Sequence, residues 1–295
     1  MIKKNTRVVK NRFGYFELAV KPTQQELDSY YNNQYYQQTK GAYQKDYSKE
    51  EKEYFNFKIE QIYQILKQIN QAGKAGKFLD IGCGEGWALN FFWKKKWQVT
   101  GLEYNRYSCK KFNPQCLKTL KTGDINRNIE KLKASGVRFD LIWLNYVLEH
   151  VLDPLALLSQ CSQLLTKNGI LVVKVPNDFS QLQNMLLKEG YVDRMYWISV
   201  PDHISYFNRG GLVKLCEVAS LKPVRVISDF PIDFNLLNKE SNYILNPDKG
   251  KSCHQSRVRL EKFIHSVSIE KTNQLYELLA DMGLGREIIG IFIKK

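Results

Sequence analysis

The sequence lacks the features of a membrane-spanning, secreted or zinc-stabilised chain. No apolar run approaches the ~18 residues that a membrane span needs. No apolar signal core follows the charged segment from Met1 to Arg7, so we expect no secretory peptide and predict a cytoplasmic location. The six cysteines form no Cys-x-x-Cys pair and lack zinc-ligand spacing, so we expect neither disulfides nor a structural metal.

Acidic residues are scarce relative to basic ones, and the formal net charge is +14. This charge favours an anionic partner such as a phosphorylated or nucleotide-linked sugar, RNA or an anionic membrane surface. A lysine-rich composition that only aids solubility explains it equally well. The chain carries no recognisable RNA-binding module, so we expect no nucleic-acid partner.

Short apolar strands alternate with helical patterns along most of the chain. Strands are expected at 77–81, 98–103, within 117–124, and at 139–144, 169–175, 224–227 and 287–293. Helices are expected at 51–72, 88–96 and 155–165, after Asn208, and in a stretch ending near Met282. The alternation predicts an α/β, Rossmann-like fold with a doubly wound, mainly parallel, seven-stranded sheet. Ligands of such sheets bind at the carboxyl ends of the strands.

The pattern also predicts an N-terminal extension and two insertions. Residues 1–50 form the extension, with a short hairpin around Gly14 and a helix opened by a capping box at 23–26. Its tyrosines either pack on the core or form a lid over a ligand: Tyr30, Tyr31, Tyr35, Tyr36 and Tyr43. Residues 51–295 form the main domain, with insertions at about 177–211 and 231–282 that are candidates for lids or substrate walls.

The strongest local pattern is a glycine turn between the strand at 77–81 and the following helix. Asp80, Gly82, Gly84 and Gly86 alternate with other residues, and the glycines allow close approach of a ligand to the backbone. The start of the next helix favours an anionic group. A dinucleotide fingerprint needs its third glycine one residue later, where Trp87 stands, so an amino-acid carboxylate suits this turn better than a pyrophosphate.

Further acidic residues follow at strand ends. Glu103 lies about 20 residues after the turn, the position of an acid that binds ribose hydroxyls. Asp124 is placed to accept from an adenine amino group, with Ile125 packing on the ring. Carboxylate, ammonium, ribose and adenine together describe S-adenosylmethionine (SAM). The alternative is an ordinary tight turn between strand and helix.

The four segments 78–86, 100–104, 123–124 and 139–154, in this order, resemble class I SAM-dependent methyltransferases. The resemblance implies SAM as cofactor and an antiparallel last strand after Gly283, and it adds Cys83, Tyr104 and Asn145 to the cofactor contacts. Residues 200–208 and 30–36 are similar to bacterial methyltransferases of surface-polysaccharide and sugar modification. The cysteine-rich zinc module of some relatives is absent, because no cysteine precedes Cys83.

Candidate catalytic groups are few, because the chain has four histidines. His150 follows the strand at 139–144 and stands beside Glu149, while His203 stands beside Asp202; each is a candidate general base. His254 and His265 are expected to be structural. Neighbouring residues in a strand point to opposite faces, so we expect no metal to be held by these pairs.

The sequence therefore predicts methyl transfer from SAM to a small molecule or glycan, foremost a hydroxyl of a sugar or phosphorylated sugar. The alternatives are a quinone or phenol O-methyltransferase, an RNA methyltransferase and a non-catalytic SAM-binding protein. The candidate substrate contacts are Tyr146, Tyr196, Trp197, Asp202 and Tyr206. The sequence does not indicate the oligomeric state.

Overall fold

The computed structural model describes residues 7–30, 46–70 and 75–295. Within these ranges no helix combines the length and apolar character needed to cross a bilayer. The tyrosines expected either to pack on the core or to form a lid fall outside the described residues, apart from the backbone of Tyr30 at the end of the first helix.

The centre of the fold is a seven-stranded sheet in the order β5-β4-β3-β6-β7-β10-β9. Its strands are β3 (Lys77–Ile81), β4 (Gln98–Glu103), β5 (Leu120–Thr122), β6 (Phe139–Asn145), β7 (Leu165–Pro176), β9 (Leu221–Ser228) and β10 (Glu287–Lys294). The β5-β4-β3-β6-β7 neighbours pair in parallel, whereas β10 is antiparallel to both β7 and β9. This confirms the mainly parallel Rossmann-like sheet and its antiparallel last strand.

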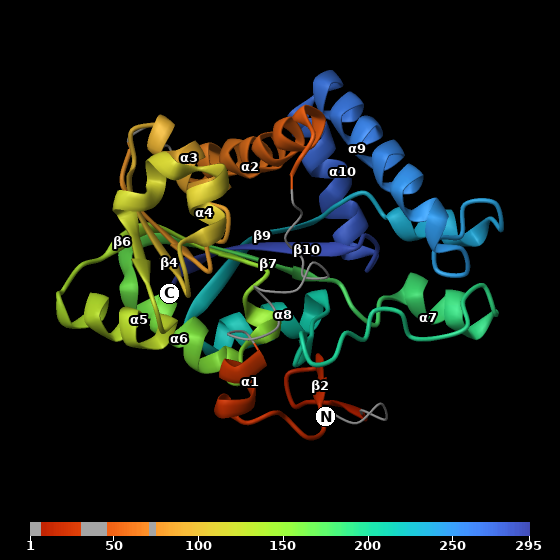
Figure 1. Ribbon diagram of the computed structural model, residues 1–295, viewed down its shortest axis with the longest axis horizontal. Helices are drawn as coiled ribbons and strands as arrows, with labels where there is room; N and C mark the ends of the chain where they lie inside the picture. The colour runs from red at the N-terminus through yellow and green to blue at the C-terminus, as the bar shows by residue number, and fades with distance from the viewer. Residues whose placement is uncertain (1–6, 31–45, 71–74) are drawn as a thin grey trace.

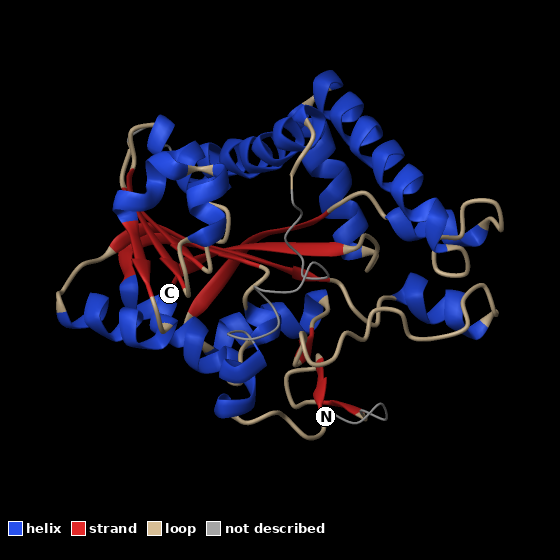
Figure 2. Ribbon diagram, viewed as in Figure 1, coloured by secondary structure: helices blue, strands red, loops and turns tan. Residues whose placement is uncertain are grey.

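Helices cover both faces of the sheet, as Figures 1 and 2 show. One face carries α2 (Lys49–Asn70), α3 (Trp87–Lys94), α4 (Tyr107–Phe112), α9 (Gly250–Val267) and α10 (Ile269–Asp281). The opposite face carries α5 (Ile125–Ala134), α6 (Pro154–Leu164) and α8 (Arg209–Val218). The remaining helices are α1 (Gln24–Tyr30) and α7 (Gln181–Lys188), with 3-10 helices at Pro114–Thr119, Leu148–His150, Ile232–Leu237 and Pro247–Lys249.

Two apolar cores form because side chains alternate along each strand. In β6, Ile142 and Leu144 join the core under α5, α6 and α8, while Leu141 and Trp143 join the core under α2, α3 and α10. The expected stripe of α2 is confirmed, since Ile59, Ile62, Ile65 and Leu66 are all buried in the second core. All six cysteines are buried free thiols. Burial of the sheet on both faces is what a parallel sheet requires.

A small three-stranded sheet ties the N-terminal segment to the first insertion. Strand β1 (Val8–Lys10) pairs with β2 (Phe16–Leu18), and β2 pairs with β8 (Ser205–Tyr206). The predicted hairpin is confirmed, and Gly14 in its turn has a φ of +96°. The capping box is confirmed as well, because Glu26 N donates to Thr23 Oγ1 while Thr23 N donates to Glu26 Oε2.

The sequence missed several helices. No helix was expected at α4, α5 or α7. The helix α5 is nevertheless strongly amphipathic, with Ile129 and Leu132 buried and lysines on the other side. Its start is fixed by Asp124, whose side chain accepts from Arg127 N at 2.6 Å.

Candidate functional site

A cavity of about 580 Å³ lies at the carboxyl ends of the parallel strands. Its wall includes Gly82 after β3, Asn145 at the end of β6 and Pro176 at the end of β7. This is the edge of the sheet at which the sequence placed the ligand, and the volume falls in the range of small-molecule sites.

The glycine turn forms one side of the cavity. Gly82, Gly84 and Gly86 have φ values of +70°, +50° and +77°, in the left-handed region that favours glycine. A Cβ at Gly82 would also meet Val147 Cγ2 at 2.5 Å. Helix α3 begins directly after this turn, and no side chain caps its first N–H groups. These donors and the helix dipole suit the carboxylate of an amino-acid ligand.

Asp80 lies in the cavity wall beneath the turn, with 3% of its surface exposed. Burial, with the nearby charge of Glu103, raises the pKa of Asp80 to about 8. A cationic ligand group would stabilise the ionised form in this position. The turn and Asp80 together therefore suit the zwitterionic amino-acid end of SAM.

Glu103 acts on the turn itself. Its carboxylate accepts from Gly84 N and from Tyr104 N, both at 2.8 Å. Gly84 lines the described cavity, whereas Glu103, Tyr104, Asp124 and Ile125 do not. The contacts of these residues with ribose and adenine stay predictions, while Glu103 holds the glycine turn and Asp124 caps α5.

Helix α2 and the segment before it supply a wall that the sequence did not reveal. Tyr47 donates to Glu85 Oε1 at 2.6 Å, and Trp87 Nε1 donates to Glu85 Oε2 at 2.9 Å. The rings of Tyr47 and Phe55 meet edge to face at 5.0 Å, and Phe55 lies 5.5 Å from Trp87. All of these residues line the cavity. No local motif marks Tyr47 and Phe55, because they reach the cavity only when α2 packs against the sheet.

Both candidate bases lie in the wall of the same cavity. The rings of His150 and His203 are 5.0 Å apart, one from the turn after β6 and the other from the first insertion. Glu149 also lines the cavity and is fully buried; neither of its oxygens has a hydrogen bond within the described residues. Glu149 Oε1 lies 3.9 Å from His150 Nε2.

The hydrogen bonds of His150 determine its tautomer. Its Nδ1 lies 2.6 Å from the carbonyl oxygen of Asp202, which can only accept. Nδ1 therefore carries a proton, and Nε2 is the acceptor nitrogen of the neutral ring. Burial lowers the pKa of His150, while burial, His150 and Arg286 lower the pKa of His203 to about 3. Burial raises the pKa of Glu149 to about 8.

The same group has the donor atoms for a metal. Glu149, His150 and His203 each offer one ligand atom, and these atoms lie within 4.8 Å of one another. The expectation that neighbouring residues diverge rested on a strand, but Glu149 and His150 lie on a 3-10 helix. That premise was wrong, because a 3-10 turn directs both side chains toward the cavity.

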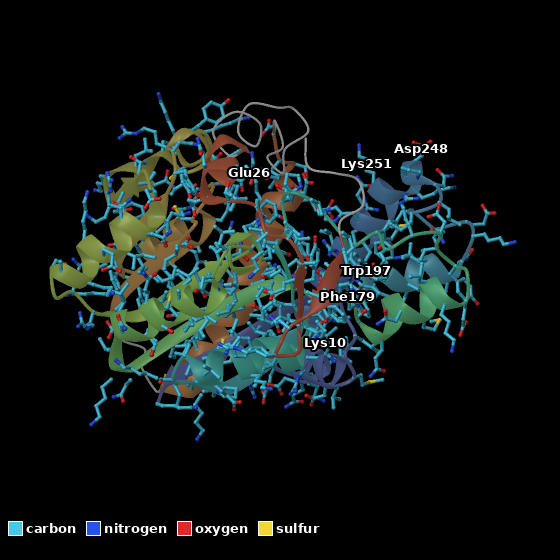
Figure 3. The ribbon with its side chains drawn as sticks, turned by 90° about the horizontal axis from the view of Figure 1, so that it is seen from below. Lys10, Glu26, Phe179, Trp197, Asp248 and Lys251 are labelled. Carbon is cyan, nitrogen blue, oxygen red and sulfur yellow. The ribbon has the colours of Figure 1, made fainter. Side chains whose placement is uncertain are left out.

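Three of the predicted substrate contacts pack inside the insertion. Trp197 and Tyr206 are buried against Phe179, at ring distances of 5.5 and 6.3 Å, and Figure 3 shows Phe179 and Trp197 beside each other. Tyr196 donates to Asp233 at 2.7 Å. None of the three lines the described cavity, so the structure favours packing for them.

Tyr146 and Asp202 do reach the cavity. Tyr146 follows β6 with a φ of +56°, which is uncommon for a residue with a side chain. Its hydroxyl donates to Glu287 of β10, which also pairs with Lys174 Nζ at 2.7 Å. The last strand therefore contributes a charged residue to the cavity that the sequence did not single out.

Comparison with known proteins agrees with this geometry. A family model described as "Methyltransferase domain" matches residues 53–226, more than half of the chain. The chain is 29% identical over 156 residues to a "Ubiquinone biosynthesis O-methyltransferase" of Dinoroseobacter shibae, covering 51% of this chain and 62% of that relative. It is 24% identical over 160 residues to a protein of the same name from Aromatoleum aromaticum, covering 53% and 68%.

Among solved structures, the fold is similar to the plantazolicin methyltransferase BamL in complex with a triazolic desmethylPZN analog and SAH. The TM-score is 0.50 at 13% identity, covering 91% of this chain and 94% of that one. At this identity the similarity concerns the fold alone.

Proposed function

The chain belongs to the methyltransferase-domain family, and we propose that it uses S-adenosyl-L-methionine to methylate a hydroxyl group on a small aromatic acceptor of the phenol or quinol type. The observation that carries the proposal is His150, a neutral imidazole with Nε2 as its acceptor nitrogen, which lines the same cavity as the glycine turn and Asp80. The names of the two curated relatives support transfer to oxygen.

The protein's contribution to the reaction is mainly positioning. SAM supplies an electrophilic methyl group, and the glycine turn, Asp80 and the start of α3 are the residues that would hold its amino-acid end. Holding the acceptor in line in a dry cavity removes much of the entropic cost of the encounter. The aromatic wall of Phe55, Trp87 and Tyr146 suits flat ligands.

His150 has the geometry of the general base. The proton of the acceptor hydroxyl passes to His150 Nε2, while Nδ1–H keeps its bond to the Asp202 carbonyl. Glu149 Oε1 stands 3.9 Å from Nε2, where a negative charge would stabilise the resulting imidazolium, but burial raises the pKa of Glu149 to about 8 and keeps it mainly protonated at neutral pH. His203 stays neutral beside them and offers a hydrogen-bonding ring to the acceptor.

The phenol proposal corresponds to the first alternative from the sequence. The preferred sugar hydroxyl gains no support from the two relatives, whose names refer to ubiquinone biosynthesis. The sugar-modification subgroup therefore stays a prediction that awaits an acceptor assay.

The test is turnover with SAM and catechol, followed by mass spectrometry of the monomethyl ether. His150→Gln should lower kcat by about 10²–10⁴-fold, the usual contribution of a general base, while SAH binding stays intact. His265→Gln is the matched control, because His265 packs between Phe57 and Tyr276 away from the cavity. Unchanged kcat in His150→Gln would overturn the assignment of the base, and methylation of sugars but not of phenols would overturn the acceptor class.

A further inference from the structure

One wall of the cavity is built from charged residues of four distant elements. Lys58 comes from α2, Lys174 from β7, Glu287 from β10, and both His254 and Arg257 from α9. Helix α9 lies beyond residues 53–226, the part that matches the family model.

The carboxylates near this wall already have donors. Glu261 accepts from Lys58 Nζ at 3.1 Å and from Tyr276 at 2.7 Å, and it also accepts from the hydroxyl of Tyr54. Glu287 accepts from Lys174 and Tyr146. The two lysines are thus matched by carboxylates at salt-bridge distance.

Arg257 also has a carboxylate at salt-bridge distance, but it is held less closely. Its nearest carboxylate oxygen is Asp229 Oδ2, 3.5 Å from Nη1, which is an ion pair without a hydrogen bond. Nη2 donates to His254 Nδ1 at 3.1 Å, and Nε has no hydrogen-bond partner in the described residues. The side chain is only 13% exposed, although a guanidinium offers five donors.

The charges of the wall do not cancel. The cations are Lys58, Lys174 and Arg257. The acidic groups paired with them are Glu261, Glu287 and Asp229. Burial opposes ionisation of Glu261 and Glu287, but the neighbouring lysines and Arg257 lower the pKa of each to about 2. Burial, with Glu287 and Glu261, raises the pKa of Asp229 to about 7, so it is only partly ionised at neutral pH.

His254 does not change this balance, since burial and Arg257 lower its pKa and keep it neutral. Arg257 therefore lies near Asp229, Glu287 and Glu261, yet within the described residues its guanidinium makes a hydrogen bond to none of these carboxylates. A buried cation is costly unless a partner matches it, and a carboxylate fits the planar fork of a guanidinium with two parallel hydrogen bonds.

We propose that Arg257 anchors a carboxylate carried by the acceptor, so that the enzyme selects anionic aromatic acceptors over neutral ones. The proposal rests on the proposed function, because it names the substrate class of the same site. The cofactor also carries a carboxylate, but the glycine turn and the uncapped start of α3 already suit that group.

The experiment compares 3,4-dihydroxybenzoate with catechol, which differ by the carboxylate alone. Calorimetry in the presence of SAH gives Kd for both ligands, with kcat/KM as a second readout. Wild-type protein should bind the benzoate about tenfold to a hundredfold more tightly, the range expected for a charge-assisted hydrogen-bonded pair. Arg257→Met should abolish this ratio.

Arg257→Lys keeps the charge but loses the fork, so it should retain only part of the ratio and guards against a misfolded Met variant. Arg259→Met is the matched control on the same helix, because Arg259 is exposed and pairs with Glu50 at 3.7 Å. This control should keep the wild-type ratio.

The outcomes separate the two proposals. Equal wild-type affinities, or a ratio unchanged in both Arg257 variants, would overturn the anchor. Weaker SAH binding in Arg257→Met with an unchanged ratio would assign the guanidinium to the cofactor and overturn it too. Arg257-dependent binding of the benzoate without methylation of either phenol would support the anchor and refute phenol methylation.

Discussion

The ionisation of Asp80 should change when the cofactor binds. Its pKa is raised to about 8 in the ligand-free protein, by burial first and then by Glu103. At about pH 6.5 such a group is ~97% protonated. The ammonium of SAM or SAH placed beside it favours the carboxylate, so binding should expel the proton.

The expected magnitude is close to one proton. The α-amino group of the ligand is itself more than ~90% protonated at about pH 6.5, so its small proton uptake leaves a net release of about 0.9 per SAH bound. A carboxyl with an ordinary pKa would already be ionised and would release essentially none. Proton release therefore distinguishes the buried Asp80 from a solvent-exposed acid.

Calorimetry measures this count directly. SAH binding is titrated at one pH in buffers with different ionisation enthalpies, and the slope of the observed enthalpy against buffer enthalpy gives the protons exchanged. Asp80→Asn is the control, since it is close in shape and cannot ionise; the released proton should disappear and affinity should fall. Tight wild-type binding with no proton release would refute both the raised pKa and the contact with the ammonium.

Three further predictions follow from the structure. Gly82→Ala should lower Tm by several degrees in a thermal melt and weaken SAH binding, because alanine is strained at this φ and its Cβ would meet Val147 at 2.5 Å; an unchanged Tm would contradict the tight turn. Stability measured by urea unfolding should fall as pH rises from about 4 to 7, since burial raises the pKa of Asp178 to about 7 and the folded state binds its proton more strongly than the unfolded state. Asp178→Asn should show a shallower slope over that window, and an identical slope would rule out this residue as the cause. Turnover should survive dialysis against EDTA, because the proposed base needs His150 Nε2 for a proton; activity lost and then restored by a divalent ion would instead assign Glu149, His150 and His203 to a metal.

The sheet and its glycine turn could be predicted because their signals are local. Strand β3 was expected at the residues where it occurs, and the apolar stripe of α2 marked its buried face. The helix start after Asn208 was also correct, since its side chain accepts from Gly211 N at 2.8 Å. Helix α5 was missed because most of its residues are polar. Its few buried apolar side chains, such as Ile129 and Leu132, are too few for the helical repeat of apolar residues to stand out in the sequence.

The acceptor side of the cavity could not be predicted in the same way. Glu149 and His150 were expected to diverge because the rule for neighbouring residues in a strand was applied to them, whereas they lie on a 3-10 helix and both offer ligand atoms close to His203. Tyr196 and Trp197 are aromatic residues of the type that lines substrate sites. In the structure Tyr196 packs instead against a small apolar cluster around Leu186 and Leu236, and Trp197 packs against Phe179. Which side chains line this part of the cavity depends on which distant segments pack together, and residue spacing along the chain does not predict that packing.

The two halves of the site differ for a physical reason. In the proposed function the cofactor is held by backbone that a glycine turn after a strand provides, so its requirement appears as a short motif around Gly82 and Gly84. The proposed acceptor is held by side chains, and any element that reaches the cavity can supply them, as α9 would with Arg257. We therefore expect a change of acceptor specificity to require substitutions in α9 and the insertions, while the glycine turn and Asp80 remain unchanged. Swapping residues 231–282 between members of the family should accordingly alter acceptor preference and leave SAH affinity unchanged, which calorimetry with both ligands measures.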